Sequence, residues 1–437
     1  MSLFGPDTVP GRPYWWDDVT WPELEGELPA TTDLLVIGAG YTGLCAAIAA
    51  HDAGARVVVI DSGQPGEGAS TRNGGMVGAH PRLDWDTLAD RYGPNTADAL
   101  FTEAGAALDW VKAMIAGEGI DCDLQDTGRI QLAYTPGHFE AQKRLAIQLS
   151  EKGGVPCQVI ERDGLPREIA SPIYKGGILF PDHGAVHPAK FFLGMLAAAL
   201  RRDIPVLAHR PAMKLFRDKA GIRVVTSRGQ VFARRVVLAT NGYTSAQFPW
   251  FARRVFPVPS YLIATEPLPA NLIGALAPGG RMMVETRARH CYYRVSPDGT
   301  RILFGARASL VNIDLDKAAQ RLHQSMLQIW PNLRHVKLSH VWTGNTGFAF
   351  NRMPHVGEAG GLHYAMGYSG GGVVLAPWLG RKAALRALDL PEGATAFAET
   401  RLASRWFFQS GPPRFMRAAD LWYRHRVDPR EDRKAGL

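Results

Sequence analysis

The glycines of Gly38–Gly43 have the spacing of a nucleotide-phosphate site, G-x-G-x-x-G. Gly38 permits a tight turn, Gly40 lets the backbone approach a pyrophosphate, and Gly43 lets a helix pack closely on a strand. The N-terminus of that helix offers free N–H groups and the positive end of its dipole to the phosphates. Asp61 follows at about 20 residues, where a carboxylate can accept hydrogen bonds from a ribose. The motif therefore predicts a dinucleotide site.

The elements that must position this motif flank it in the required order. A short apolar run at residues 34–37 is typical of a buried strand, and the alanine-rich residues 44–53 have good helix propensity. Gly54 is a candidate C-cap, and a second apolar run, residues 56–60, leads to Asp61. This order predicts a Rossmann-type βαβ unit. The acid argues against the 2′-phosphate of NADP, but the unit alone does not decide between NAD and FAD.

A second glycine-rich segment favours FAD. The loop Gly66–Met76 begins shortly after Asp61. Its small residues let backbone N–H groups meet phosphate oxygens or the edge of a ring, and Arg72 adds a positive charge. A nicotinamide dehydrogenase has no evident use for such a loop. The alternative, a flexible glycine loop, agrees less well with the embedded residues 70–73.

These segments resemble the D-amino-acid oxidase, glycine oxidase and sarcosine oxidase family of flavoproteins. Within it, they are most similar to gamma-glutamylputrescine oxidoreductase-like members. The similar segments run in family order from about residue 32 to residue 386. They are the S-x-R-N-G-G of Ser70–Gly75, the strand and turn of Val236–Gly242, the W-x-G of Trp342–Gly344 with the N-R-x-P of Asn351–Pro354, and the G-x-S-G-x-G-V of Gly367–Val373.

The resemblance implies an α/β (α+β) fold, in which a Rossmann-type FAD-binding domain is intertwined with a substrate domain built on an antiparallel sheet. It implies that residues 30–83, 153–243 and 340–437 form the FAD domain. Residues 84–152 and 244–339 would form the substrate domain, and residues 1–29 an N-terminal extension. Periodicity independently predicts helices at residues 97–115, 138–151, 189–202 and 316–330, and a hairpin of residues 222–226 and 231–238.

The resemblance also implies FAD as the cofactor. Non-covalent binding is expected, and a covalent link to the flavin is the alternative. A helix over residues 373–387, interrupted at Pro377, would place Gly370–Gly372 at its N-terminus. Such a helix end stabilises the negative charge that a reduced flavin develops near N1 and the C2 carbonyl. Cys291 is the cysteine nearest the expected site, and buried packing is its expected role. The predicted cofactor residues are Gly38, Gly40, Tyr41, Thr42, Gly43, Asp61, Ser62, Gly68, Ala69, Ser70, Thr71, Arg72, Asn73, Gly74, Gly75, Met76, Met213, Thr240, Asn241, Gly344, Gly367, Ser369, Gly370, Gly371, Gly372 and Val373.

The implied reaction is oxidation of a C–N bond by hydride transfer to flavin N5, giving an imine that hydrolyses. The cofactor supplies this chemistry, so the expected protein residues line and orient the site rather than form a triad. His290 or Tyr292 is expected to face the substrate, with an exposed basic strand as the alternative. Tyr261 is a second candidate. Arg352 is expected to contact the flavin or an anionic substrate group, with a structural ion pair as the alternative.

Two departures from the family pattern bear on the reaction. Glycine-oxidase-like members carry an arginine four residues after the tryptophan of W-x-G, where it grips the substrate α-carboxylate. This chain has Thr346 there, which favours an amine or an ω-carboxylated amine over a glycine or D-amino acid. No lysine lies between Lys219 and Lys317, so the lysine that activates oxygen in sarcosine-oxidase-like members has no counterpart. Molecular oxygen and another electron acceptor therefore both stay open.

Composition excludes several other classes of protein. The net charge of +8 arises largely between residues 401 and 434, no aromatic-basic repeat occurs, and nucleic acid is not an expected partner. The four cysteines form no C-x-x-C pair or zinc pattern, so no metal is expected. No signal peptide or apolar run of about 20 residues is present, which predicts a cytoplasmic location. The basic segment 414–426 is expected to pack its aromatic residues on the FAD domain, with a membrane surface as the alternative. A nicotinamide dehydrogenase, an FAD-dependent D-amino acid or glycine-type oxidase, and a binding protein are the remaining functional alternatives, and the oligomeric state stays open.

Overall fold

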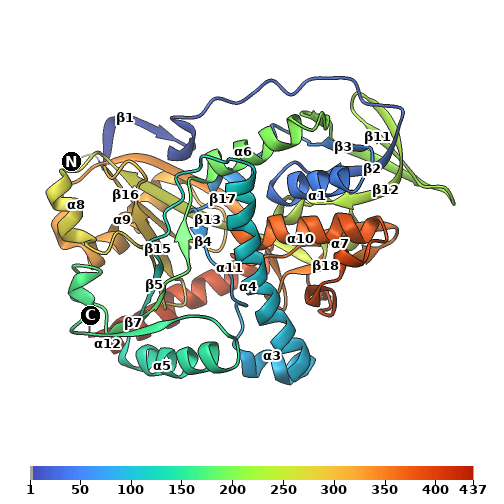
Figure 1. The fold of residues 1–437 in the computed structure, drawn as a ribbon. Helices are drawn as coiled ribbons and strands as arrows, with labels where there is room; N and C mark the ends of the chain where they lie inside the picture. The colour runs from blue at the N-terminus through green and yellow to red at the C-terminus, as the bar shows by residue number, and fades with distance from the viewer. Residues whose placement is uncertain (1–2, 437) are drawn as a thin grey trace.

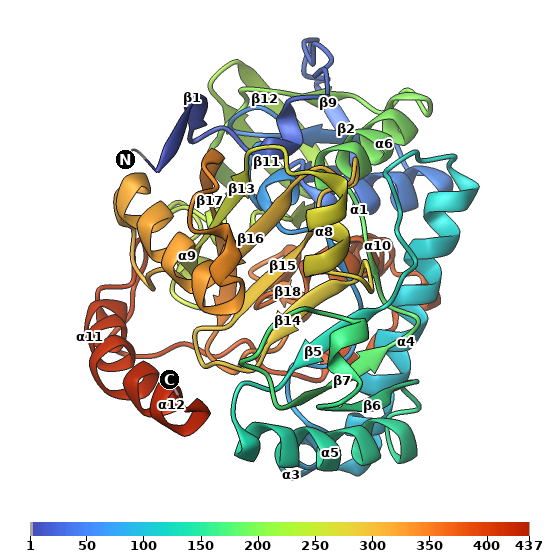
Figure 2. The same cartoon turned by 90° about the vertical axis from the view of Figure 1, so that its left-hand side faces the viewer.

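Two large sheets form the centre of the molecule (Figures 1 and 2). The computed structural model describes residues 3–436, and for Asp7 the backbone alone. The eight-stranded sheet runs β10-β11-β12-β2-β3-β9, with β19 also beside β12 and β18 beside β19. Its strands are β2 (Thr31–Ile37), β3 (Val57–Ile60), β9 (Val206–Leu207), β10 (Ala212–Arg217), β11 (Ile222–Thr226), β12 (Gly229–Leu238), β18 (His355–Ala359) and β19 (Leu362–Met366).

The predicted βαβ unit is confirmed. β2 and β3 pair in parallel, and α1 (Tyr41–Asp52) connects them. Every residue of β3 is buried, as expected for a parallel strand covered on both faces. α10 (Gly372–Ala387) packs beside α1 on one face of this sheet (Figure 1). The two helices cross so closely that a Cβ on Gly380 would lie 2.1 Å from the Thr42 carbonyl oxygen.

The predicted interruption of this helix at Pro377 is wrong. α10 continues through Pro377, and residues 373–380 are all buried. A proline inside a helix costs about 3 kcal/mol through the lost hydrogen bond and the clash of its ring. Burial of apolar side chains on both sides of the proline offsets this cost.

The nine-stranded sheet runs β1-β17-β13-β16-β15-β14-β5-β7-β6. Side chains alternate between its two faces. Ile263, Tyr293 and Phe304 pack on the side of α9 (Leu315–Ile329), whereas Leu262 and Leu303 pack on the opposite face with Trp15 and Trp342. The strands are β1 (Phe4–Pro10), β5 (Arg129–Leu132), β6 (Gln158–Glu161), β7 (Gly176–Phe180), β13 (Val255–Thr265), β14 (Met282–Glu285), β15 (Cys291–Val295), β16 (Ile302–Ala306) and β17 (Leu338–Ala349).

Membership of this sheet differs from the predicted domain boundaries. β6 and β7 come from the segment 153–243, and most of β17 from the segment 340–437, all predicted for the FAD domain. β1 comes from the predicted N-terminal extension and pairs with β17. Local patterns could not reveal this, because sheet membership depends on partners distant in sequence. Elsewhere the division into two domains stays a proposal.

The predicted helices and hairpin are confirmed within a few residues. His187 caps α6 (Pro188–Leu200), its ring accepting a hydrogen bond from the Lys190 N–H at 3.2 Å. The helices not yet given are α2 (Ala69–Arg72), α3 (Trp85–Tyr92), α4 (Pro94–Gly117), α5 (Pro136–Glu151), α7 (Pro249–Ala252), α8 (Ala270–Leu276), α11 (Phe415–Trp422) and α12 (Asp428–Ala435), and β4 (Met76–Val77) pairs with β8 (Gly184–Ala185).

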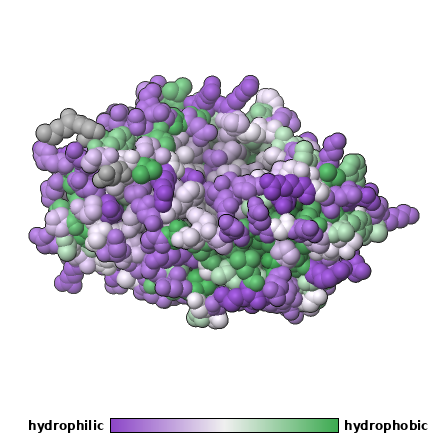
Figure 3. All heavy atoms as spheres, turned by 90° about the horizontal axis from the view of Figure 1, so that it is seen from above, coloured by the Kyte–Doolittle hydropathy of each residue, from purple (hydrophilic) through white to green (hydrophobic). Residues whose placement is uncertain are grey.

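The C-terminal segment packs only part of its aromatic surface. Phe415 contacts Phe256 of β13, which belongs to the nine-stranded sheet, while Leu421 and Trp422 are exposed. Within residues 3–436 no helix has the length and apolar character needed to cross a membrane. Hydrophilic side chains cover much of the face shown in Figure 3, and hydrophobic ones gather mainly along the lower edge of that view.

Candidate cofactor and substrate site

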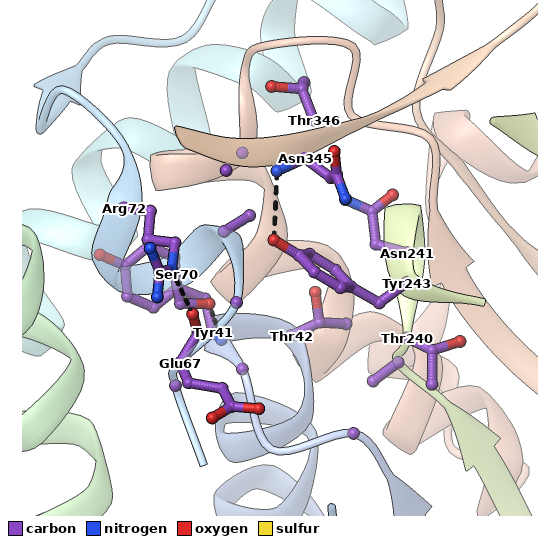
Figure 4. Close-up of a pocket in the computed structure, with 18 of the residues that line it drawn as sticks. Tyr41, Thr42, Glu67, Ser70, Arg72, Thr240, Asn241, Tyr243, Asn345 and Thr346 are labelled. Carbon is purple, nitrogen blue, oxygen red and sulfur yellow. Dashed lines mark hydrogen bonds between the residues drawn. The ribbon is translucent and has the colours of Figure 1, made fainter. Parts of the chain in front are cut away.

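A cavity of about 900 Å³ is bordered by strands of both sheets and by the N-termini of α1 and α10. Its volume lies in the upper part of the range of about 300–1,000 Å³ typical of ligand pockets. Figure 4 shows Glu67, Ser70 and Arg72 on one side of it and Thr240, Asn241 and Tyr243 on the other. The predicted cofactor residues on its wall are Gly38, Gly40, Tyr41, Thr42, Asp61, Ser62, Gly68, Ala69, Ser70, Arg72, Asn73, Thr240, Asn241, Gly344, Gly370, Gly372 and Val373.

Two helix N-termini face this cavity. α1 begins after Gly40 and α10 after Gly371. Both N-cap residues are glycines, so no N-cap side chain bonds to the N–H groups of either first turn. The N–H of Tyr41 donates to Ser70 Oγ at 3.1 Å, while other N–H groups of these first turns are left for a ligand. Two positive dipole ends on one cavity favour a ligand with two separate electron-rich parts. A pyrophosphate and a flavin ring meet this requirement.

The turn before α1 has no room for side chains. Gly38 has φ +105°, and a Cβ on Gly43 would lie 1.8 Å from the Gly38 carbonyl oxygen. At Gly40 a Cβ would lie 2.8 Å from Ser70 Oγ. The backbone is therefore open toward the cavity where a phosphate must approach, and the residues present fit a bound dinucleotide.

Asp61 supports this turn as well as lining the cavity. Its carboxylate accepts hydrogen bonds from the Ala39 N–H at 2.7 Å and the Gly63 N–H at 3.0 Å. Burial raises the pKa of Asp61, although these backbone hydrogen bonds act in the opposite direction. The carboxylate thus joins β3 to the glycine turn, and a ribose hydroxyl would be a further partner for it.

Replacing Asp61 by alanine should weaken FAD retention and lower thermal stability, because bound cofactor stabilises the fold by mass action. Two buried N–H groups would also lose their acceptor, at about 1–3 kcal/mol each. Asp61→Asn should have an intermediate effect, because the two N–H groups bond to different carboxylate oxygens and an amide has only one oxygen that can accept. Flavin fluorescence during dialysis measures the retention. Unchanged FAD affinity in Asp61→Ala would show that Asp61 merely ends a strand.

Three tryptophans hold the glycine-rich loop, two of them by its backbone, and sequence reasoning missed these contacts. Trp15 donates from Nε1 to the Asn73 carbonyl at 2.8 Å, and Trp342 donates to the Arg72 carbonyl at 3.0 Å. Trp16 donates to Thr71 Oγ1 at 2.9 Å. The aromatic run 14–16 in the N-terminal segment was the available signal, but only the fold shows what it contacts.

The remaining predicted cofactor residues lie outside the cavity wall. Gly43 is buried under the turn. Gly74 lies against Tyr292, and a Cβ on Gly74 would lie 2.8 Å from a carbon of the Tyr292 ring. Met213 is half exposed, with its neighbour Ala212 on the wall. Their assignment to the cofactor stays a prediction. The residues are Gly43, Thr71, Gly74, Gly75, Met76, Met213, Gly367, Ser369 and Gly371.

Of the four candidate substrate residues, only Tyr261 lies on the cavity wall. Its hydroxyl donates to the Val311 carbonyl at 3.2 Å and accepts from the Ile313 N–H at 2.9 Å. Tyr292 lies behind Gly74, with its hydroxyl 2.8 Å from Ser260 Oγ. The structure places these residues, and their roles stay predictions.

His290 and Arg352 lie in a separate group of basic residues. Burial, followed by the charges of Arg307 and Arg82, lowers the pKa of His290 well below its usual value. Arg352 forms no ion pair with a described residue, so the structural alternative for it is not supported. Its φ of +61° is an unusual conformation for a side-chain-bearing residue.

His80 and Cys291 lie away from the cavity. His80 stacks on Phe180 and its Nε2 lies 2.9 Å from Arg129 Nη2; burial and this arginine lower the pKa of His80 to about 4. Cys291 is buried in the core beside α9, as expected for a packing role, and burial raises the pKa of its thiol.

Tyr243 was not predicted and occupies one side of the cavity. Its hydroxyl accepts a hydrogen bond from the Asn345 N–H at 3.1 Å (Figure 4). Thr346, which stands where an arginine was expected, also lies on the wall. The β17 wall therefore offers no charged group at this point.

Comparison with known proteins agrees with the fold. The gamma-glutamylputrescine oxidoreductase of Escherichia coli (strain K12) is 30% identical over 353 residues, covering 80% of this chain and 82% of that protein. The probable oxidoreductase OrdL of Haemophilus influenzae is 28% identical over 403 residues, covering 90% of this chain and 92% of that protein. The crystal structure of glycine oxidase from Geobacillus kaustophilus superposes with a TM-score of 0.69 at 20% identity, over 86% of this chain and 99% of that one.

A family model settles the choice between NAD and FAD that the βαβ unit left open. The model described as FAD dependent oxidoreductase (DAO) matches residues 33–386, which include the glycine turn, the loop 66–76 and the start of α10. This span contains every predicted cofactor residue. The chain is an FAD-dependent oxidoreductase of the DAO family.

Proposed function

We propose that this enzyme oxidises the C–N bond of an amine that carries no carboxylate on the oxidised carbon. Bound FAD would supply a hydride acceptor at N5. The observation that carries the substrate assignment is Thr346, because a threonine on the cavity wall cannot make a bidentate charged contact with an α-carboxylate. The relative from Escherichia coli, named for gamma-glutamylputrescine, supports an amine substrate.

The chain's own residues would position the substrate and manage its proton. The lowered pKa of His290 keeps its imidazole neutral near pH 7, so it can accept a hydrogen bond from the amine. The free N–H groups at the start of α10 would stabilise negative charge on the reduced cofactor. The Tyr292 ring against Gly74 would hold the loop that borders the reacting centre.

The test is flavin reduction without oxygen by a panel of substrates at matched concentration. Purified protein should be yellow and release FAD on denaturation. Primary or secondary alkylamines and ω-amino acids should bleach the flavin rapidly, whereas glycine and D-alanine should do so poorly. The discrimination should be steep, because an unpaired buried carboxylate costs several kcal/mol, at least about 3. Rapid bleaching by α-amino acids alone would refute the proposal.

The electron acceptor and location belong to the same proposal. We infer that molecular oxygen or another small acceptor reoxidises the flavin, and oxygen consumption under turnover distinguishes the two. The four cysteines are free thiols in the structure. Free thiols are usual in a reducing compartment, which supports a cytoplasmic location.

A further inference from the structure

Three arginines gather beside the cavity without an acidic partner. Arg82 and Arg307 both lie over the Phe348 ring, with guanidinium-to-centroid distances of 5.8 and 4.8 Å. Arg352 is close enough to act electrostatically on both. None of the three forms an ion pair with any side chain that the structure describes.

The mutual repulsion of these arginines affects their pKa values. Burial, then the charge of Arg82, lowers the pKa of Arg307 to about 9. Burial and Arg352 lower the pKa of Arg82. Two nearby arginines do have acidic partners: Arg287 pairs with Glu285, and Arg289 pairs with Asp428. Arg82 and Arg352 are exposed and Arg307 is half-buried, so their guanidinium groups are accessible to a ligand that would neutralise them.

The position of the group ties it to the cavity. Arg307 directly follows β16 and continues the alternation of Leu303 and Gly305, so it lies on the sheet face toward the glycine loop. Arg82 Nη1 donates to the Ser369 carbonyl at 2.9 Å, and it lies 3.3 Å from where a Cβ on Gly370 would be. Gly370 lines the cavity at the start of α10.

The other arginines of the cavity are already engaged. Arg72 donates to the carbonyls of Glu67, at 2.7 Å, and of Gly11, at 3.1 Å. Arg210 donates to the Gly26 carbonyl at 3.1 Å, on the side of Asp61. Among the described residues, the side chains of Arg307 and Arg352 make no hydrogen bond, and Arg82 uses only Nη1. Free cationic donors therefore lie at the end of the cavity marked by Gly370, away from the βαβ turn.

We propose that Arg82, Arg307 and Arg352 bind a carboxylate of the substrate, so that the physiological amine carries an acidic group remote from the carbon that is oxidised. Guanidinium groups form planar, paired hydrogen bonds with carboxylates, which suits an anion lying over a ring such as that of Phe348. The inference deepens the proposed function and rests on it for the amine half of the substrate. His290, neutral beside the arginines, would contact the stem between the two ends.

The kinetic test compares pentylamine with 5-aminopentanoate, which differ at the remote end. Anaerobic flavin reduction in the holoenzyme gives the half-saturating concentration of each. Arg307→Met should raise the half-saturating concentration of 5-aminopentanoate about 10- to 100-fold, the loss of affinity expected when a charged hydrogen-bonded contact is removed. The half-saturating concentration of pentylamine should change by less than about twofold. Arg352→Gln is a second variant with the same expectation, and Arg223→Met, at an exposed arginine of β11, is the matched control. Equal effects on both substrates would overturn the inference.

A second measurement needs no turnover. Pentanoate cannot be oxidised at an amine, and it should raise the melting temperature of the wild-type holoenzyme by binding the arginines. Arg307→Met should melt at the same or a higher temperature without pentanoate, because it removes an uncompensated charge, and should respond less to pentanoate. If the variant has a lower melting temperature and pentanoate still raises it as much as in the wild type, Arg307 has a structural role and the inference is overturned.

Two further outcomes separate the possible failures. If the variant shifts the flavin midpoint potential and keeps its pentanoate response, the arginines serve the flavin and the inference is overturned. If neither amine reduces the wild-type flavin, the proposed function fails, while the melting experiment still decides whether the arginines bind a carboxylate.

Discussion

Replacing Gly43 by alanine is expected to give colourless protein that is less stable by about 3 kcal/mol or more. The new Cβ would lie 1.8 Å from the Gly38 carbonyl oxygen, and a backbone atom cannot rotate away. Overpacking in a close-packed interior typically costs about 1–3 kcal/mol and occasionally more. The displaced turn would also remove the pyrophosphate site, so the stabilisation by FAD would be lost as well. The ratio of flavin to protein and urea unfolding measure the two effects.

The matched control is Gly105→Ala, also within a helix. Gly105 lies inside α4, and no atom lies within 4 Å of the position its Cβ would take. Alanine there should raise the free energy of unfolding by about 0.5–1 kcal/mol, because glycine loses more backbone freedom on folding. Full FAD content in Gly43→Ala would contradict the assignment of this turn to the pyrophosphate.

Replacing Trp15 by alanine should cost about 3–5 kcal/mol of stability, the usual range for a buried tryptophan. Its side chain is fully buried against Leu262 and Trp342, on the sheet face toward the glycine loop. The Asn73 carbonyl would also lose its donor, so the loop 66–76 should loosen and FAD should dissociate more readily. Denaturant unfolding and fluorescence titration with FAD measure the two effects.

Trp406→Ala is the control for this change, because the Trp406 side chain is 89% exposed. Its stability should stay within about 0.5 kcal/mol of the wild type, with unchanged FAD affinity. If Trp15→Ala behaved like Trp406→Ala, the N-terminal segment would not support the cofactor loop.

The sequence predicted best where the signal is local. Residues 32–61 encode strand, glycine turn, helix and second strand within about 30 residues, so the βαβ unit and most of the phosphate side of the cavity could be read directly. The N-terminus of α10 was predicted for the same reason. Pro377 misled because burial of the surrounding residues outweighs the helix-breaking tendency of proline.

What the sequence did not reveal depends on contacts between distant residues. Trp15 meets Asn73 and Trp342 meets Arg72 only after the two sheets assemble. Arg82 and Arg307 are 225 positions apart and are ordinary arginines in any local window, yet both lie over Phe348. A local pattern therefore predicted Arg352 as a lone candidate and missed the group to which it belongs.

The pairing of β1 with β17 has a consequence for how the protein is made. Thr8 bonds to the Leu338 carbonyl, 330 residues further along the chain. At a synthesis rate of about 5–20 residues per second, the first strand waits roughly 15–65 seconds for its partner to leave the ribosome. Trp15 waits equally long for Trp342. β1 and Trp15 thus find their places only after a long interval, during which this aromatic segment is exposed to chaperones and to neighbouring nascent chains.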